Sequence, residues 1–176
     1  MKELSLHILD LVENSVAAGA CHVLISLETN ESEGLLRLSV EDDGAGMDPE
    51  TLQSALKQGF TTRTNGRGGN GLPLLCDAVH SAGGELSLWS CEGEGTEVRA
   101  WYPTAHENAL PIGDLAETMT VLLTAHPYVD VVFRHRNASR ILLYSTAQAR
   151  QLAARDARPG PAAWNWTRAV FKEHPV

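Results

Sequence analysis

The chain has 176 residues and a hydrophobic content of 43%, which is enough for a packed core and suits one domain or one domain with a small appendage. Its 14 basic and 22 acidic side chains give a formal net charge of -8, which argues against nucleic-acid binding, because that function needs a basic surface. No apolar run approaches the roughly 18 residues of a membrane span, and the charged N-terminus is not typical of a signal peptide.

The charge is distributed unevenly along the chain. Residues 1–104 carry 6 basic and 16 acidic side chains, whereas residues 105–176 carry 8 and 6. The change coincides with the stretch between Pro103 and Pro111. We therefore expect a first domain over residues 1–104 and a small C-terminal region over residues 105–176.

The three cysteines, Cys21, Cys76 and Cys91, show no paired spacing of the kind that metal sites use. Their odd number also argues against a disulfide framework. We expect reduced thiols in a cytoplasmic protein, because free thiols persist in that compartment.

The first part of the chain alternates between helical and strand patterns. Apolar residues recur at helical spacing from Leu4 to Val16, and Gly19 follows as a C-cap residue. Asp48 before Pro49 is typical of a helix start. The predicted elements are a helix over 3–18, a hairpin over 22–42, helices over 48–58 and 72–82, and a hairpin over 85–103.

The C-terminal region predicts a helix, a hairpin and two more helices. Asp114 is a candidate N-cap of the first helix, and the hairpin turns at Asn137. Trp164, Trp166 and Phe171 either pack on the region's own hairpin, which is the simpler interpretation, or form a hydrophobic anchor for a partner. The predicted ranges are 112–127, 129–146, 147–157 and 162–174.

The first helix carries a polar face. Asp10 and Asn14 are one helical turn apart, so their side chains lie on the same side. An amide oxygen can ligate Mg²⁺, and a carboxylate one turn away can orient or deprotonate a water molecule. His7 lies on the same face, and we expect it to be a surface histidine. The alternative for the whole face is an ordinary solvated one.

Two short glycine turns adjoin predicted strands. In EDDGAGMD, residues 41–48, the glycines permit close approach to a flat ligand, and Asp43 can accept a hydrogen bond from an amine such as that of adenine. In EGEGTEV, residues 92–98, Gly95 and Thr96 begin a strand. The alternative for both segments is an ordinary turn.

The segment FTTRTNGRGGNGLPLL, residues 60–75, is a glycine-rich loop that leads directly into a helix. Backbone N–H groups and the helix N-terminus can bind phosphates there, and hydroxyl and guanidinium groups add donors. The loop lacks the Gly-Lys-Ser/Thr ending of a P-loop and does not follow a strand as a dinucleotide fingerprint does. The alternative is a flexible surface loop.

These four segments, in this order, resemble the GHKL superfamily of ATP-binding domains, which includes gyrase B, Hsp90, histidine kinases, MutL and the anti-sigma-factor kinases. ILDLVENSVAAGA resembles the N box, EDDGAGM the G1 box, GFTTRTNGRGGNGLPLL the F box, lid and G2 box, and EGTEV the G3 box. The resemblance covers about residues 3–103. It implies a two-layer α/β sandwich, with helices on one face of a mixed, mainly antiparallel sheet, extended here by a small C-terminal α/β appendage.

The resemblance also implies roles in binding ATP and Mg²⁺. Asn14 matches the asparagine that holds Mg²⁺ against the phosphates, Asp43 the aspartate that reads the adenine amine, and Thr96 the threonine that supports it. Asp10 occupies the position of the general base, where the ATPases and anti-sigma kinases place a longer glutamate. The other implied nucleotide contacts are Gly44, Gly46, Met47, Thr61, Thr62, Arg63, Arg67, Gly68, Gly69, Gly71 and Leu72.

No helical hairpin with a phosphoacceptor histidine precedes the N box, so we expect a free-standing module that acts on a separate partner protein. The favoured function is an ATP-dependent kinase or weak ATPase in signal transduction. The alternative is a non-catalytic nucleotide switch that regulates a partner such as a redox enzyme complex or a sigma-type factor. Neither a nucleic acid nor a membrane is expected as a partner, and the resemblance leaves a homodimer open.

Overall fold

Six helices and six strands make up the computed structural model, which describes residues 3–57, 71–155 and 159–174. In chain order the elements are α1 (Leu4–Ala17), β1 (His22–Asn30), β2 (Leu35–Asp42), α2 (Pro49–Ser54), α3 (Gly71–Ser81), β3 (Glu85–Cys91), β4 (Gly95–Pro103), α4 (Leu115–Ala125), β5 (Asp130–Arg136), β6 (Ile141–Ser145), α5 (Thr146–Ala154) and α6 (Pro159–Glu173).

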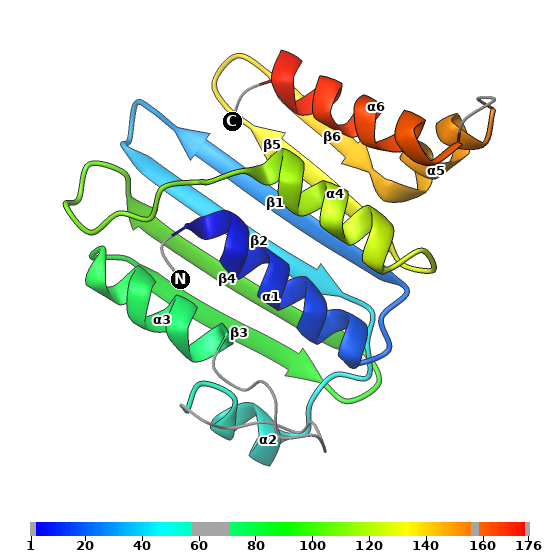
Figure 1. Ribbon diagram of the computed structural model, residues 1–176. Helices are drawn as coiled ribbons and strands as arrows, with labels where there is room; N and C mark the ends of the chain where they lie inside the picture. Colours follow the sequence, from blue (N-terminus) through cyan, green and yellow to red (C-terminus); the bar gives the residue numbers. More distant parts are fainter. Residues whose placement is uncertain (1–2, 58–70, 156–158, 175–176) are drawn as a thin grey trace.

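All six strands form one mixed sheet in the order β3-β4-β2-β1-β5-β6. Four of the neighbouring pairs are antiparallel, and β1 with β5 is parallel. Helices α1, α3, α4 and α6 lie together on one face of this sheet (Figure 1). The predicted fold class, a two-layer α/β sandwich with a mainly antiparallel sheet, is confirmed.

The core lies between the sheet and the helices. Burial alternates along β2, so that Leu36, Leu38 and Val40 are buried under the helices while Arg37 on the opposite face is exposed. Helix α1 contributes Ile8, which is fully buried, to this layer. Polar residues on the other face let one side of an antiparallel sheet contact water.

The C-terminal region extends the same sheet, because β5 pairs with β1 and β6 pairs with β5. Phe171 of α6 packs against Phe133 and Tyr144 with ring centroids 5.4 Å apart in both pairs, and Trp166 stacks on Tyr144 at 5.5 Å. Packing of these aromatic residues on the region's own hairpin is therefore confirmed, whereas Trp164 is 48% exposed. The division of the chain into two domains stays a prediction.

Helix α2 is shorter than the sequence pattern predicts. Asp48 caps it as expected, accepting hydrogen bonds from the N–H groups of Glu50 and Thr51. The helix nevertheless ends at Ser54, and none of its residues is buried. Without an apolar face against the core, its favourable start is not extended by tertiary packing, which supplies most helical stability.

Two further expectations concern thiols and membranes. Cys21, Cys76 and Cys91 are free thiols in the structure, and Cys21 and Cys91 are exposed. Within residues 3–57, 71–155 and 159–174, no helix combines the length and apolarity that crossing a bilayer requires.

Candidate functional site

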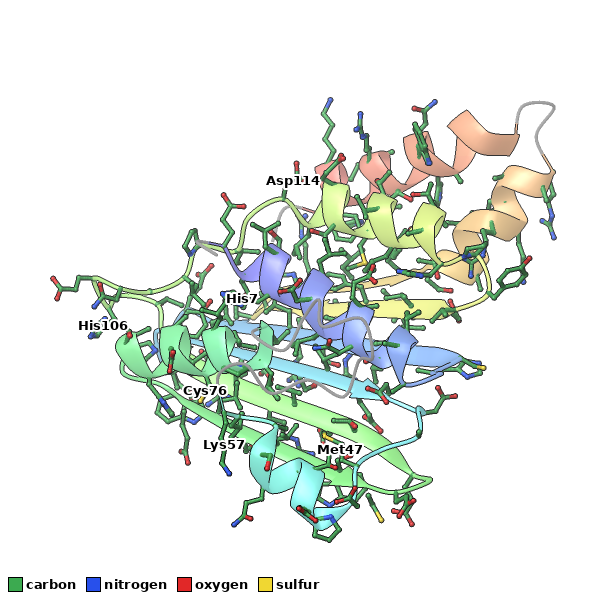
Figure 2. All side chains as sticks on the ribbon, turned by 60° about the horizontal axis from the view of Figure 1, so that its bottom comes forward. His7, Met47, Lys57, Cys76, His106 and Asp114 are labelled. Carbon is green, nitrogen blue, oxygen red and sulfur yellow. The ribbon has the colours of Figure 1, made fainter. Side chains whose placement is uncertain are left out.

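The predicted site residues of α1, β2 and β4 meet at one end of the sheet, where β2 ends and β4 begins. Asp42 and Thr96 are directly paired across these two strands. The loop after β2 is tied to the β3–β4 hairpin by two hydrogen bonds, from Gly93 N–H to the Ala45 carbonyl (2.8 Å) and from Met47 N–H to Ser90 Oγ (2.9 Å). Met47 lies at this end of the sheet in Figure 2.

Asp42 is the carboxylate that faces the helical layer. It follows Leu38 and Val40 in the alternation of β2 and therefore lies on the covered face. One carboxylate oxygen accepts a hydrogen bond from Ser15 Oγ of α1 (2.6 Å), and the other accepts one from the Gly44 N–H (2.9 Å). These bonds fix the carboxylate between α1 and the loop after β2.

Two hydroxyl groups complete this polar cluster. Thr96 Oγ1 lies 2.9 Å from Ser90 Oγ, and Ser90 Oγ also donates to the Gly95 carbonyl at 2.9 Å. With Ser15 and Asp42 they form a row of polar groups where an apolar core would otherwise continue. A cluster of one carboxylate and several hydroxyls can recognise a ligand that presents both donors and acceptors.

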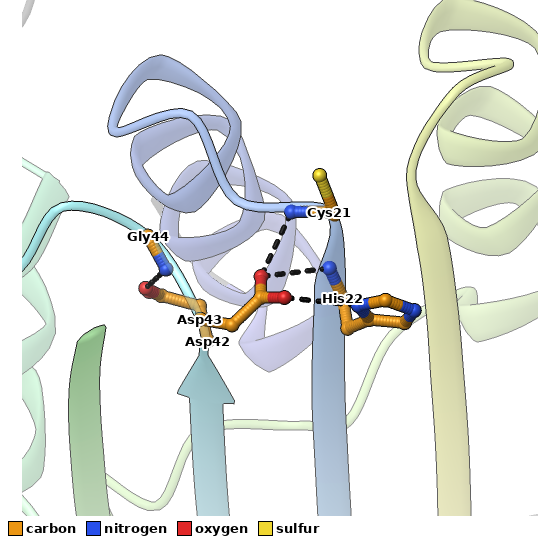
Figure 3. Close-up of polar contacts among 5 residues, drawn as sticks. All are labelled: Cys21, His22, Asp42, Asp43 and Gly44. Carbon is orange, nitrogen blue, oxygen red and sulfur yellow. Dashed lines mark hydrogen bonds and ion pairs between the residues drawn. The ribbon is translucent and has the colours of Figure 1, made fainter. Parts of the chain in front are cut away.

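Asp43 points elsewhere. Its carboxylate accepts hydrogen bonds from the N–H groups of Cys21 and His22, both at 2.8 Å, and contacts His22 Nδ1 at 2.9 Å (Figure 3). Hydrogen bonds from the His22 backbone and side chain hold the pKa of Asp43 below its usual value. The sequence pattern favours Asp43 as the base-reading carboxylate, but the structure uses Asp43 to join the start of β1 to the end of β2.

Two glycines let the loop after β2 fit between neighbouring backbones. Gly46 has a φ of +66°, and a Cβ atom there would lie 1.9 Å from the Cys91 carbonyl oxygen. Gly44 lies against the end of α1, where a Cβ atom would approach the Ala18 Cβ to 3.0 Å. The Ala45 N–H also donates to the Ala18 carbonyl (2.9 Å). The small residues at the end of α1 are therefore explained by close packing of this loop.

Asp10 lies where α1 meets the start of α3. A Cβ atom on Gly71, the first residue of α3, would lie 3.0 Å from Asp10 Oδ2 and 3.1 Å from Asp10 Cβ. Asn14 is one turn further along α1 and is exposed, and Leu72 of α3 packs against the core. The α1 carboxylate is thus close to a helix N-terminus, whose unpaired N–H groups favour negative charge.

His7 is not a surface residue, so that expectation is wrong. It lies on the same flank of α1 as Asp10 and is only 1% exposed, because α1 packs against α3 as well as against the sheet (Figure 2). Among the described residues, neither ring nitrogen has a hydrogen-bond partner. Burial lowers the pKa of His7 to about 4, so its imidazole is neutral at physiological pH.

Some predicted residues lie outside the described residues, and the structure gives no information on them. These are Thr61, Thr62, Arg63, Arg67, Gly68 and Gly69, all in the segment 58–70. In the part of the chain that the structure describes, no group of three or more His, Cys, Asp or Glu side chains is arranged to hold a metal ion.

Sequence comparison finds one family over this part of the chain. The family described as histidine kinase-, DNA gyrase B- and HSP90-like ATPase matches residues 2–106. Similar curated proteins include the sensor histidine kinase ZraS of Escherichia coli K12 (32% identity over 96 residues), the sensor histidine kinase WalK of Bacillus subtilis (32% over 91) and the sensor protein kinase FleS of Pseudomonas aeruginosa (38% over 89). The matches cover 54, 49 and 51% of this chain but only 20, 15 and 22% of those relatives.

Among solved structures, the N-terminal domain of a DNA repair protein superposes with a TM-score of 0.55 and 17% identity. The superposition covers 81% of this chain and 52% of that one. At this level of identity the likeness concerns the fold alone.

Proposed function

Because the chain belongs to the family of histidine kinase-, DNA gyrase B- and HSP90-like ATPases, we propose that it binds ATP with Mg²⁺ at the end of the sheet and acts as a kinase or ATPase on a separate protein. The observation that carries this proposal is that three kinds of polar group lie close together at one end of the sheet. A fixed carboxylate lies at the end of β2, a carboxylate and an amide lie one turn apart on α1, and the start of α3 adjoins them.

Asp42, rather than Asp43, is our candidate for reading the adenine base. Its carboxylate is held on the covered face by Ser15 and the Gly44 N–H and lies next to Thr96 across the sheet. A carboxylate fixed in this way can accept a hydrogen bond from the exocyclic amine on C6 of adenine. Guanine carries a carbonyl oxygen on C6 and cannot donate there. Asp43 is less suited, because His22 and Cys21 already occupy its oxygens.

Asn14 and the start of α3 are our candidates for the phosphate side. Mg²⁺ in nucleotide sites is commonly held by one or two protein oxygens together with phosphate oxygens and water, so a cluster of acidic residues is not needed. The exposed amide of Asn14 can supply such an oxygen. The N–H groups at the start of α3 can stabilise phosphate charge, and Gly71 lets them approach α1 closely.

Asp10 is our candidate for the proton acceptor. Bound ATP would supply a phosphoryl group for transfer to water or to a protein side chain. Asp10 lies half-buried at the α1–α3 junction, where it can accept a proton from the attacking group. The three free thiols and the similar sensor kinases support a role in signalling inside the cell.

Binding is tested by calorimetric titration with ATP and with a non-hydrolysable analogue, with and without Mg²⁺. We expect Mg²⁺ to raise the affinity of the wild type at least tenfold, and we expect Asn14→Ala to remove this gain. No binding at millimolar nucleotide would contradict the proposal.

Catalysis is tested by following radiolabelled ATP in the wild type and in Asp10→Asn. We expect the variant to bind ATP normally and to lose turnover by about 100-fold, the lower end of the usual effect of a general base. Equal, measurable turnover in both proteins would contradict the role of Asp10 as proton acceptor, and no turnover in the wild type would instead support a non-catalytic nucleotide switch.

A further inference from the structure

Helix α4 of the C-terminal region lies alongside α1 and is hydrogen-bonded to it near both ends (Figure 1). Near the start, Thr118 Oγ1 donates to the Ser5 carbonyl at 3.4 Å, and the Ser5 N–H donates to the Ile112 carbonyl at 2.8 Å. Near the end, His126 Nε2 lies 2.6 Å from Glu13 Oε1. The two helices therefore run in the same direction and are joined at matching positions.

The Glu13–His126 contact is partly shielded from solvent. His126 caps the C-terminus of α4, and its side chain is 16% exposed, whereas that of Glu13 is 40% exposed. A short contact in this setting is less weakened by salt and water than an ion pair on the open surface. Through this contact the C-terminal region reaches the last turns of α1.

Glu13 is well placed to control the nucleotide groups of α1. It directly precedes Asn14 and is three residues after Asp10, and its side chain contacts His126 after α4, whereas Asp10 adjoins the start of α3. Helix α1 is thus held between two neighbours, with Asp10 against the start of α3 and Glu13 against the end of α4. The Glu13–His126 contact therefore fixes the residue that directly precedes Asn14.

We propose that His126 is a positioning residue for the nucleotide site, and that the C-terminal region regulates ATP binding through its contact with Glu13. This inference rests on the proposed function of the α1 face. The contact pre-organises Asn14, so that less conformational freedom is lost when nucleotide and Mg²⁺ bind.

A double-mutant cycle tests this coupling, with Glu13→Ala, His126→Ala and the double variant. The readouts are the ATP dissociation constants with and without Mg²⁺, together with the thermal midpoint of the nucleotide-free protein. We expect each single variant to weaken Mg²⁺–ATP binding about fivefold, which corresponds to about 1 kcal/mol, and to change Mg²⁺-free binding less. We expect the double variant to be no weaker than either single variant, because both remove one interaction.

Two further variants separate positioning from general stability. His126→Gln keeps an N–H donor for Glu13, and we expect it to bind Mg²⁺–ATP within twofold of the wild type. Arg168→Ala breaks the exposed 3.1 Å ion pair between α6 and Glu117 of the same helix α4, away from α1, and we expect no change in affinity beyond twofold.

The possible failures are distinguishable. A wild type that does not bind ATP would overturn the proposed function and this inference together. A wild type that binds ATP, with His126→Ala and Glu13→Ala binding equally well, would overturn the inference alone. Additive losses in the double variant, or a loss in Arg168→Ala that follows its thermal midpoint, would also overturn it, because the effect would then come from general destabilisation.

Discussion

Two regions of the sheet bury side chains of different kinds. At the end of β2 and the start of β4, the covered face carries Asp42 and Thr96, whereas the covered face of β5 and β6 carries Phe133 and Tyr144 under Phe171 of α6. The first region joins its segments by polar hydrogen bonds and close backbone contacts, and the second by aromatic packing. Polar burial contributes little net stability, while aromatic burial contributes much.

The two regions of this one sheet therefore differ in what they contribute: the first presents oriented polar groups, and the second contributes stability. The end of β2 keeps oriented polar groups at the edge of the core, and the apolar part of the sheet continues into the C-terminal region. Helix α4 connects the two, because it packs against both α1 and α6. The C-terminal region thus packs against the helix that carries Asp10 and Asn14, although it contains none of the sequence motifs.

The largest expected effect comes from removing an aromatic side chain from the C-terminal core. Phe171 is 7% exposed, and we expect Phe171→Ala to lower the free energy of unfolding by about 4 kcal/mol. Urea unfolding should be followed both by circular dichroism and by tryptophan fluorescence, with Trp164→Ala as the exposed control. A single transition is expected, because both regions share one sheet. Two separate transitions would support independent domains and contradict the comparison.

The second prediction concerns the close packing of the loop after β2 against the β3–β4 hairpin. We expect Gly46→Ala to lower stability by about 3 kcal/mol, because a Cβ atom would add a clash with the Cys91 carbonyl to an unfavourable positive φ. Gly93 also has a positive φ, +81°, but a Cβ atom there would meet nothing within 4 Å. We expect Gly93→Ala to lower stability by only about 1 kcal/mol in the same urea experiment. Equal losses would show that close approach is not what requires Gly46.

The third prediction concerns His7, the buried histidine of α1. Because the pKa of His7 is about 4 in the folded protein and 6.5 in the unfolded chain, the unfolded state binds more protons between these values. The contribution of His7 to stability is therefore fully present above pH 6.5 and is lost progressively as the pH falls toward 4. The loss at pH 5 is expected to be about 2 kcal/mol relative to pH 7.5.

The variant His7→Leu tests this origin of the pH dependence. We expect the difference between its stability and that of the wild type to change by about 2 kcal/mol between pH 7.5 and pH 5, in favour of the variant at the lower pH. His80, which is exposed, provides the control variant His80→Gln, which should follow the wild type. Parallel pH profiles for wild type and His7→Leu would contradict burial of a neutral His7.

Much of the fold can be predicted from local sequence patterns. The helix expected over 3–18 is α1, and the hairpin expected over 22–42 is formed by β1 and β2. These elements are predictable because helical spacing and strand alternation depend on neighbouring residues only. Periodicity does not predict that β5 pairs in parallel with β1, because that pairing joins segments more than 100 residues apart.

The candidate site is less predictable for the same reason. Asp42 could have been found from the sequence, since Leu36, Leu38 and Val40 establish which face of β2 is buried and Asp42 continues that series. The burial of His7 could not, because the pattern of one helix shows nothing of the distant elements, such as α3, that pack against it. The Glu13 contact with α4 is equally non-local. Local patterns thus identify the polar groups, while the topology decides which of them share a surface.

The most direct test of the account is to compare ATP affinity in Asp42→Asn and Asp43→Asn by titration calorimetry in the presence of Mg²⁺. The two variants make the same isosteric change at adjacent positions whose carboxylates point in different directions (Figure 3). We expect Asp42→Asn to weaken ATP binding about 100-fold and Asp43→Asn to stay within threefold of the wild type. The reverse order, or equal losses in both variants, would contradict the assignment of the nucleotide site to the covered face of the sheet.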